Sequence, residues 1–293
     1  MATGVGLLCS RVRVEEKGIL AALSGVGVPG STVPPDQPLP SASELAESGM
    51  PGVVIDRFSN RTAAPVLLGL LGARGVPTID AGLAARANRV ETALALQAAG
   101  LPRPEMQVAI GEEAALALAS ASATPMTLLP LTPGSAGVTL WDQDTAEAVL
   151  EHRGVLGGAS ENVFVLQQGA PATADRVTMT VVGGVVAGVE TPGERAVWPE
   201  AMALAVQAAR VLRAGLVGVE LTHTAAGWVI WDVVPIPDFR LAIPVGCASV
   251  AAAIADLASE RLGEQATRLA PADVPALDWV PAGGVVDEFA AHV

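Results

Sequence analysis

Lysine is almost missing from this chain of 293 residues. Lys17 is the only lysine, and arginine carries nearly all the positive charge. A compact, movable ammonium is the group that most sites use to grip a row of phosphates. The Ala-, Gly-, Val- and Arg-rich composition is typical of a GC-rich genome, which explains part of the deficit. The part of the lysine deficit that composition does not explain disfavours a conventional phosphate-binding site.

Other absences narrow the class of protein further. There is no tyrosine, and the two cysteines, Cys9 and Cys247, lie far apart without a Cys-x-x-Cys or Cys/His cluster. This spacing disfavours a zinc site or a disulfide framework, so we predict that both thiols are core residues. No apolar run approaches the ~20 residues of a membrane span, and the N-terminus lacks a signal-peptide pattern. We therefore expect a soluble, cytoplasmic protein.

The charge balance excludes two kinds of partner. The formal net charge is −13, whereas binding to nucleic acid needs clustered Lys and Arg. An anionic membrane surface would repel the chain for the same reason. We therefore predict no nucleic-acid partner and no membrane partner. A hydrophobic content of 51% is ample for one or two cores spread over two or three lobes.

The first 80 residues alternate between short apolar runs and helical patterns. Strands are predicted at 4–9, 52–57 and 76–80, with helices at 15–23 and 62–74 between them. This alternation predicts a small α/β lobe with a parallel sheet. The Pro- and Ser-rich stretch 30–43 (GSTVPPDQPLPSAS) is expected to be an exposed loop.

The remaining chain changes its pattern near residue 176. A helix is predicted over 83–99, followed by strands and helices up to residue 167. The sequence then favours a hairpin around Gly183–Gly184, a helix at 199–214 and a pair of strands at 215–221 and 227–234. A last helix is predicted at 246–262, before a Pro-rich tail.

Three groups of polar residues are candidates for chemistry. Glu220 and Asp232 sit in the apolar strands VGVEL and WVIWDVV, where an unpaired carboxylate is costly. They indicate either a metal or nucleotide cleft, or salt-bridged acids at strand ends. The turn TPGSAG (132–137) is either a phosphate-covering loop or an ordinary turn. The stretch DRFSNR (56–61) either binds an anion or is a solvated loop that caps a helix.

Three segments together indicate a family. They are NRVETALALQAAGLPRP (88–104), AVLEHRGVLGGASENVFVLQQG (148–169) and the strand pair that holds the two acids. In order and spacing they resemble the ATP-grasp carboxylate–amine ligases of the LysX/RimK type, and most closely the LysX branch, across residues 4–262. The resemblance implies an ATP-grasp fold. Its expected parts are an N-terminal parallel α/β lobe (1–82), a central lobe (83–160), a C-terminal antiparallel-sheet lobe (161–265) and a tail (266–293).

The resemblance also implies roles for particular residues, and a homodimer or homotetramer. The implied nucleotide-binding residues are Arg89, Gly134, Ser135, Gly137, Gln167, Gln168 and Arg176. The implied substrate-binding residues are Arg57, Ser59, Arg61 and Arg195. The implied magnesium ligands are Glu220 and Asp232. ATP and Mg²⁺ are expected as cofactors only if this cleft still functions.

The sequence departs from the family at four positions that are polar in the ligases. They are Leu129, Val138, Thr178 and Val234. Because each loss weakens the grip on charged phosphate groups, we expect weak or no ligase activity and a role in binding a protein or amino-acid ligand. The alternative is an active ATP- and Mg-dependent ligase that makes an amide through an acyl phosphate. That ligase would use Arg89, Arg176, Arg195, Glu220 and Asp232. A third possibility is a structural subunit that pairs with an active homologue.

Overall fold

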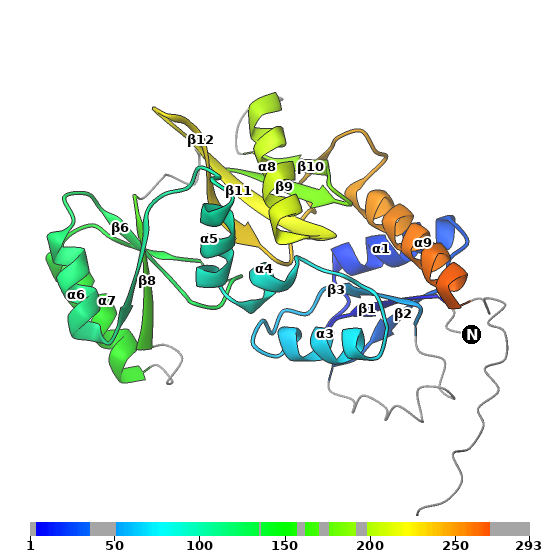
Figure 1. Cartoon of the computed structure of the whole chain (residues 1–293), viewed down its shortest axis with the longest axis horizontal. Helices are drawn as coiled ribbons and strands as arrows, with labels where there is room; N and C mark the ends of the chain where they lie inside the picture. The colour runs from blue at the N-terminus through cyan, green and yellow to red at the C-terminus, as the bar shows by residue number, and fades with distance from the viewer. Residues whose placement is uncertain are drawn as a thin grey trace, which may run out of the picture.

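The computed structural model describes residues 4–35, 51–134, 136–156, 162–169, 176–191 and 198–269. Three β-sheets, each covered by helices, make up this part of the chain. Figure 1 shows the N-terminal sheet beneath helix α9, the central sheet with helices α6 and α7 at the far end, and the C-terminal sheet between them. The predicted α/β class, with one parallel and two antiparallel sheets, is thereby confirmed.

The N-terminal sheet is parallel, as predicted. In sheet order its strands are β2 (Gly30–Val33), β1 (Val5–Leu8), β3 (Val53–Asp56) and β4 (Thr78–Ile79). The connecting helices include α1 (Val14–Gly25) and α3 (Ala64–Ala73). The prediction of a loop at 30–43 was wrong for β2. This short edge strand is almost wholly exposed, so it carries no hydrophobic signal.

The predicted helix at 83–99 is two helices, α4 (Leu83–Ala87) and α5 (Arg89–Ala98). Asn88 separates them in an extended conformation, and its Oδ1 accepts a hydrogen bond of 2.9 Å from the backbone N of Glu91. Asparagine caps a new helix in this way because its side chain replaces a missing backbone acceptor. The break matters because it fixes the direction of Arg89, the first residue of α5.

The central sheet is antiparallel and is covered by helices on one face. In sheet order its strands are β5 (Met106–Ile110), β8 (Val163–Gln168), β6 (Met126–Leu129) and β7 (Val138–Leu140). Helices α6 (Glu112–Ala121) and α7 (Gln143–Leu156) contribute Ala115, Ala146 and Leu150 to a core shared with Leu128 and Phe164. Gln167 of β8 lies on the opposite face and donates to the backbone oxygen of Trp231 in the C-terminal sheet.

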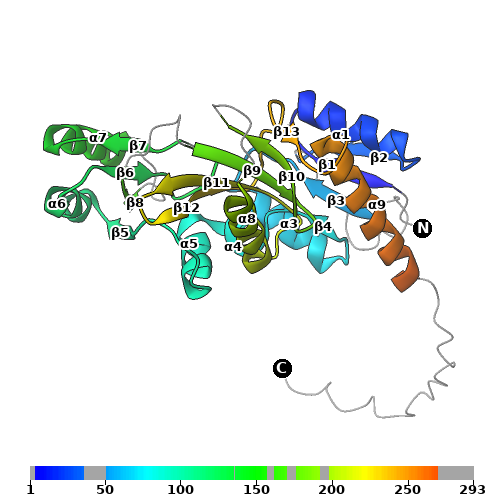
Figure 2. The same cartoon turned by 90° about the horizontal axis from the view of Figure 1, so that it is seen from above.

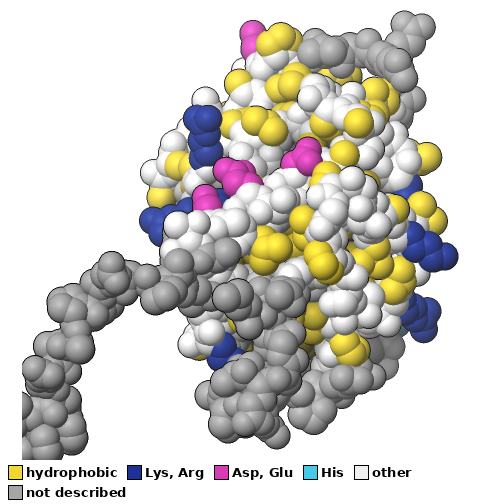
Figure 3. All heavy atoms as spheres, turned by 90° about the vertical axis from the view of Figure 1, so that its right-hand side faces the viewer, with side chains coloured by type: hydrophobic (Ala, Val, Ile, Leu, Met, Phe, Trp, Pro, Cys, Tyr) yellow, Lys and Arg dark blue, Asp and Glu magenta, His cyan; other side chains and the backbone are white. Residues whose placement is uncertain are grey.

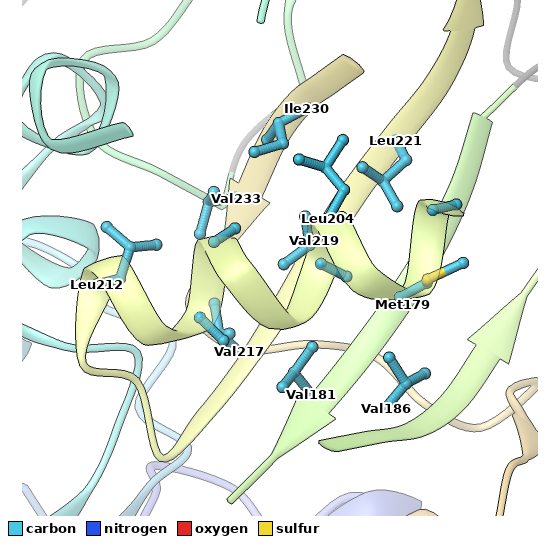
Figure 4. Packing of buried hydrophobic residues seen from close by; sticks show 14 of the residues in the cluster. Met179, Val181, Val186, Leu204, Leu212, Val217, Val219, Leu221, Ile230 and Val233 are labelled. Atoms are coloured by element: carbon cyan, nitrogen blue, oxygen red, sulfur yellow. The ribbon is translucent and has the colours of Figure 1, made fainter. Parts of the chain in front are cut away.

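The C-terminal sheet is also antiparallel and supports helix α8 (Pro199–Leu212). In sheet order its strands are β12 (Gly227–Val234), β11 (Leu216–Thr224), β9 (Arg176–Val182), β10 (Val185–Glu190) and β13 (Ile243–Pro244). Figure 4 shows Leu204 and Leu212 of α8 lying over Val217, Val219 and Val233. The predicted hairpin and strand pair are confirmed.

Helix α9 (Val250–Leu269) returns to the N-terminal sheet and lies against α1 (Figures 1 and 2). Val250 and Ile254 share a core with Ile19, Leu23 and Val53. The helix begins and ends later than the predicted 246–262. Most of the predicted tail, 270–293, lies outside the described residues.

Two features of the described part of the chain concern membranes and partners that need a basic surface. None of its helices combines the length and the apolar character that crossing a membrane requires. On the side of the molecule nearest α9 (Figure 3), hydrophobic side chains are scattered and acidic side chains lie between basic ones at the margins. That face therefore offers no broad basic patch among the residues described.

Candidate functional site

The two predicted acidic residues lie side by side in the C-terminal sheet. Glu220 of β11 pairs directly with Asp232 of β12. The neighbouring residues Val219 and Val233 pack against α8, so alternation along the strands turns both acids to the opposite face. Both acids lie within their strands and not at strand ends, but each has an arginine as ion-pair partner, as the alternative of salt-bridged acids expected.

Asp232 is held by Arg89. Nε and Nη2 of Arg89 both donate to the Asp232 carboxylate, with Nη2 2.7 Å from Oδ2. Nη1 of Arg89 donates to the backbone oxygens of Pro130 (2.7 Å) and Thr132 (2.9 Å). The Arg89 side chain is only 4% exposed. This arginine therefore joins three elements: the start of α5, the segment after β6, and β12.

Glu220 faces a second arginine. Arg176 of β9 lies 4.0 Å from its carboxylate, and the Arg176 guanidinium stands 5.2 Å from the centre of the Trp231 ring. Burial raises the pKa of Glu220 above its ordinary value, and the neighbouring charge of Asp232 adds to the rise. Each acid of the pair thus has its own arginine.

These residues do not fit a magnesium ion held by the protein. Mg²⁺ prefers six oxygen ligands in octahedral geometry, whereas Val234, two residues after Asp232, offers only an apolar side chain. Asp232 is already bound through both oxygens. In the described ranges of the chain, no three His, Cys, Asp or Glu side chains gather in a group that could hold a metal. The guanidinium groups of Arg89 and Arg176 lie beside the carboxylates of Asp232 and Glu220 and supply the positive charge that a metal ion would otherwise provide.

Gln167, at the end of β8, closes the space between the two sheets. It is fully buried, and its Nε2 donates to the backbone oxygen of Trp231 at 3.0 Å. The cavity lined by Arg89, Arg103, Gln167 and Trp231 has a volume of about 10 Å³, enough for about one water molecule. Gln168, the other predicted residue here, is exposed, and its backbone N donates to Glu105.

The Gly-rich turn lies beside the N-terminal sheet. Gly134 has φ +99°, and a Cβ placed on it would lie 3.7 Å from Cγ of Arg61. Gly137 packs so closely on Thr127 and Leu129 that an added Cβ would clash with both. The turn therefore favours glycine at position 134 because of the positive φ, and at position 137 because of the close packing. Ser135 lies outside the described residues.

The predicted substrate-binding arginines already have partners within the protein. Arg57 donates from Nε to Glu16 (2.8 Å) and from Nη1 to the backbone oxygen of Pro237 (2.8 Å). Nη1 of Arg61 donates to Asp56 (2.8 Å). Both arginines are buried, so the alternative of a solvated loop was wrong for them. Ser59 is exposed, and Arg195 lies outside the described residues.

Comparison with known proteins places this geometry in a family. No family profile matches the chain. The crystal structure of a RimK domain ATP-grasp protein from Sphaerobacter thermophilus is 31% identical, with a TM-score of 0.74, and the match covers 87% of this chain and 99% of that one. The chain belongs to the RimK-type ATP-grasp family.

Two more distant structures share the ATP-grasp fold. D-alanine–D-alanine ligase from Bacillus anthracis is 12% identical with a TM-score of 0.65, covering 91% of this chain and 100% of that one. The ATP-grasp ligase PsnB, in a complex with a minimal precursor, Mg and ADP, is 14% identical with a TM-score of 0.61, covering 88% and 98%. At these identities the likeness concerns the ATP-grasp fold alone.

Several residues of this ATP-grasp site were not predicted from the sequence. Arg103 lies 3.5 Å from Gln167, and burial lowers its pKa. Trp231 sits at a bulge in β12, where the pairing with β11 shifts register. The sequence did contain one signal for Trp231: this residue directly precedes Asp232, which was predicted to be a site residue.

Proposed function

We propose that this chain is an ATP-grasp protein with little or no ligase activity, which acts by binding a ligand or a partner protein. The observation that carries the proposal is the pairing of each predicted metal-ligand acid with an arginine of the same chain: Asp232 with Arg89, and Glu220 with Arg176. The chain itself therefore supplies positive charge beside Glu220 and Asp232, where a bound metal ion would otherwise supply it.

The cost of opening this arrangement supports the proposal. For Arg89 to grip a phosphate group, it would have to leave a carboxylate and two backbone oxygens. Asp232 would then be a mostly buried charge without its ion-pair partner, which is strongly unfavourable. The apolar replacements Leu129, Val138 and Val234 supply no polar group in exchange. Phosphoryl transfer depends on such groups for most of its transition-state stabilisation.

The second candidate is an active ATP-dependent carboxylate–amine ligase, and one observation favours it. Arg89 and Arg176 both lie at the acid pair, where a ligase that had exchanged lysine for arginine would need its cations. Val138 is 38% exposed, so it does not form a closed apolar plug with the buried Leu129. In this case Arg89 and Arg176 would leave the two carboxylates and bind the phosphate groups of ATP.

Calorimetric titration separates the two candidates. Purified protein is titrated with ATP and with ADP, each with and without Mg²⁺, beside a Glu220→Gln/Asp232→Asn double variant. We expect no binding that depends on Mg²⁺ in the native chain. Mg-dependent binding that disappears in the double variant would contradict the view that the arginines replace the metal, and it would favour the ligase candidate. A Glu151→Gln variant, which changes an exposed acid on α7, controls for the loss of charge.

We further propose that the chain forms a homodimer or homotetramer, for which the family resemblance is the support. Sedimentation equilibrium of the purified protein tests the oligomer, and a monomer at micromolar concentration would contradict it.

A further inference from the structure

Helix α3 carries no polar or charged side chain, because its sequence is APVLLGLLGA. Ala64, Leu68 and Leu71 are buried against the N-terminal sheet. Val66 and Leu70, one turn apart on the outer side, are 62% and 44% exposed. The outer face of a surface helix ordinarily carries polar side chains. A wholly apolar outer face therefore indicates a surface that another segment or another protein covers.

The position of α3 shows which part of the chain comes near this face. Helix α3 lies on the side of the N-terminal sheet away from α9 (Figure 1), and none of the described helices or strands lies over its outer side. The end of α9 nevertheless meets the end of α3, since Nε2 of Gln265 donates to the backbone oxygen of Gly75 at 3.3 Å. The chain that follows Leu269 therefore starts about one helical turn from the C-terminal end of α3.

The sequence beyond α9 is long enough to cover α3 and has the apolar side chains to do so. The tail runs from position 270 to 293 and includes Leu277 and Trp279. An extended chain spans about 3.3 Å per residue, so Leu277 can lie up to about 26 Å from the end of α9. Helix α3, with 10 residues, is only about 15 Å long. Both side chains can therefore reach any part of its outer face.

Charge favours the tail as the segment that covers α3. Arg74 directly follows the helix and is half-buried; its Nη1 has no hydrogen-bond partner, and its side chain has no ion pair, among the residues that the structure describes. The tail contains acids and no Lys or Arg: its acids are Asp273, Asp278, Asp287 and Glu288. The first two flank Leu277, so a carboxylate can lie beside Arg74 while the apolar side chains lie on α3.

A second copy of the chain fits this face less well. Stable dimers bury at least about 1,200 Å² in total, whereas the outer face of α3 is about 15 Å long and one helix wide. A segment of the same chain needs much less area, because its attachment gives it a high effective concentration at the face. The size of the face therefore favours the tail over a partner subunit.

We propose that the tail segment 273–280 binds to the outer face of α3 in the same chain, with its large apolar side chains against Val66 and Leu70 and one of its acids beside Arg74. This inference goes beyond the proposed function and is independent of it, because it involves neither a nucleotide nor the acid pair in the C-terminal sheet. Binding of the tail removes from water an apolar face that would otherwise promote association between molecules.

Fluorine NMR of the whole chain labelled with 5-fluorotryptophan tests the proposal. The chain has five tryptophans, and the signal of Trp279 is assigned by its loss in Trp279→Phe. We expect this signal in the native protein to lie away from its position in urea, at every protein concentration. In Val66→Gln/Leu70→Gln it should move to the position in urea. The ratio of bound to free tail should fall roughly tenfold or more, because less apolar surface then leaves water on binding.

Two further variants make the test specific. Arg74→Gln should lower the ratio of bound to free tail by roughly two- to fivefold, the effect expected of one surface ion pair. Val185→Gln is the matched control, because Val185 in the C-terminal sheet is also 62% exposed, and it should leave the Trp279 signal unchanged. The other four tryptophans lie among the described residues, so their signals report whether each variant folds.

Three results would overturn the proposal. The first is a Trp279 signal that lies at its position in urea already in the native protein. The second is a signal that does not respond to Val66→Gln/Leu70→Gln while the other tryptophan signals show a folded chain. The third is a shifted signal that returns to the position in urea on dilution, which would assign the face of α3 to a second copy of the chain. An unchanged ratio in Arg74→Gln would contradict the contact between Arg74 and an acid of the tail.

Discussion

At the scale of single residues, the candidate site depends on the ion pair between Arg89 and Asp232. Replacing Arg89 with Met removes the arginine's hydrogen bonds to two backbone oxygens and leaves the mostly buried Asp232 carboxylate with the backbone N–H of Val233 but without its charged partner. We expect a loss of about 3 kcal/mol in the free energy of unfolding, measured by urea denaturation. The double variant Arg89→Met/Asp232→Leu should recover part of that loss, because no charge is then left unpaired.

Arg210→Met, on the exposed face of α8, is the control for removing an arginine and should change stability by less than about 0.5 kcal/mol. A loss in Arg89→Met as small as in this control would contradict the view that the pair holds the site together. It would also weaken the proposal that the acids are neutralised from within.

Glu220 gives a prediction on pH. Burial and Asp232 raise its pKa, so the folded protein binds this proton more tightly than the unfolded chain. Its ionisation therefore lowers stability as pH rises from the ordinary value of 4.5 through the folded pKa. We expect Glu220→Gln to be more stable than the native chain at pH 8, by about 1 kcal/mol or less. The difference should shrink towards pH 4.5.

Urea unfolding at a series of pH values measures this effect, with Glu151→Gln on α7 as the matched control. A difference between Glu220→Gln and the native chain that grows on acidification would show that the carboxylate is stabilised by Arg176. That result would reverse the sign we infer.

Sequence reasoning placed Arg89 and Arg176 in the same cleft as the acid pair, but as nucleotide-binding residues and not as ion-pair partners of the acids. Glu220 and Asp232 were found because a carboxylate in an apolar strand needs an explanation. Their arginines come from α5 and β9, far away in sequence, and only the pairing of the sheets brings them together. The burial of Arg57 and Arg61 was missed for a similar reason, since their acid partners look like ordinary surface residues in sequence.

At the scale of elements, glycines test how closely the helices and strands approach. Gly82 precedes α4 with φ +84°, and an added Cβ would come 1.8 Å from the backbone oxygen of Leu212 at the end of α8. Gly75 has a similar φ of +74° but open space around it. We expect Gly82→Ala to cost at least about 3 kcal/mol, and Gly75→Ala about 1–2 kcal/mol from backbone strain alone.

Thermal unfolding followed by circular dichroism compares the two variants on equal terms. Equal losses in both would mean that α4 and α8 separate easily, and that strain alone matters at Gly82.

The same scale explains the errors in element boundaries. Asn88 was included in a helix because the hydrophobic period continues across it, and β2 was missed because an exposed edge strand has no such period.

At the scale of the whole molecule, Arg57 links segments that are far apart in the sequence. It joins Glu16 of α1 to Pro237, in the connection between β12 and β13, and its guanidinium lies 5.2 Å from the centre of the Phe239 ring. The hydrophobic pattern predicted the parallel N-terminal sheet and the hairpin and strand pair of the C-terminal sheet, and the family resemblance implied the division into lobes. It did not predict this link, because the Pro237 contact is made by the main chain.

Arg57→Met should therefore uncouple the N-terminal sheet from α9 as well as destabilise the chain. Burial acts to raise the pKa of Glu16, but the hydrogen bond and charge of Arg57 outweigh it and hold this pKa below its ordinary value. The native pair thus adds stability above the ordinary pKa, and this is lost as pH falls through the folded pKa. In the variant, Glu16 is a fully buried acid without its main partner, so acidification should restore stability.

We expect Arg57→Met to lose about 3–5 kcal/mol at pH 7.5, with faster hydrogen exchange in α1 and α9 than in the central sheet. Arg57→Lys is the informative comparison, because a lysine can balance Glu16 but cannot also reach the backbone oxygen of Pro237 with a planar fork. It should recover most of the pH dependence while the exchange in α9 stays fast. Exchange that rises equally in all three sheets would contradict a local link and indicate that the chain unfolds as one cooperative unit.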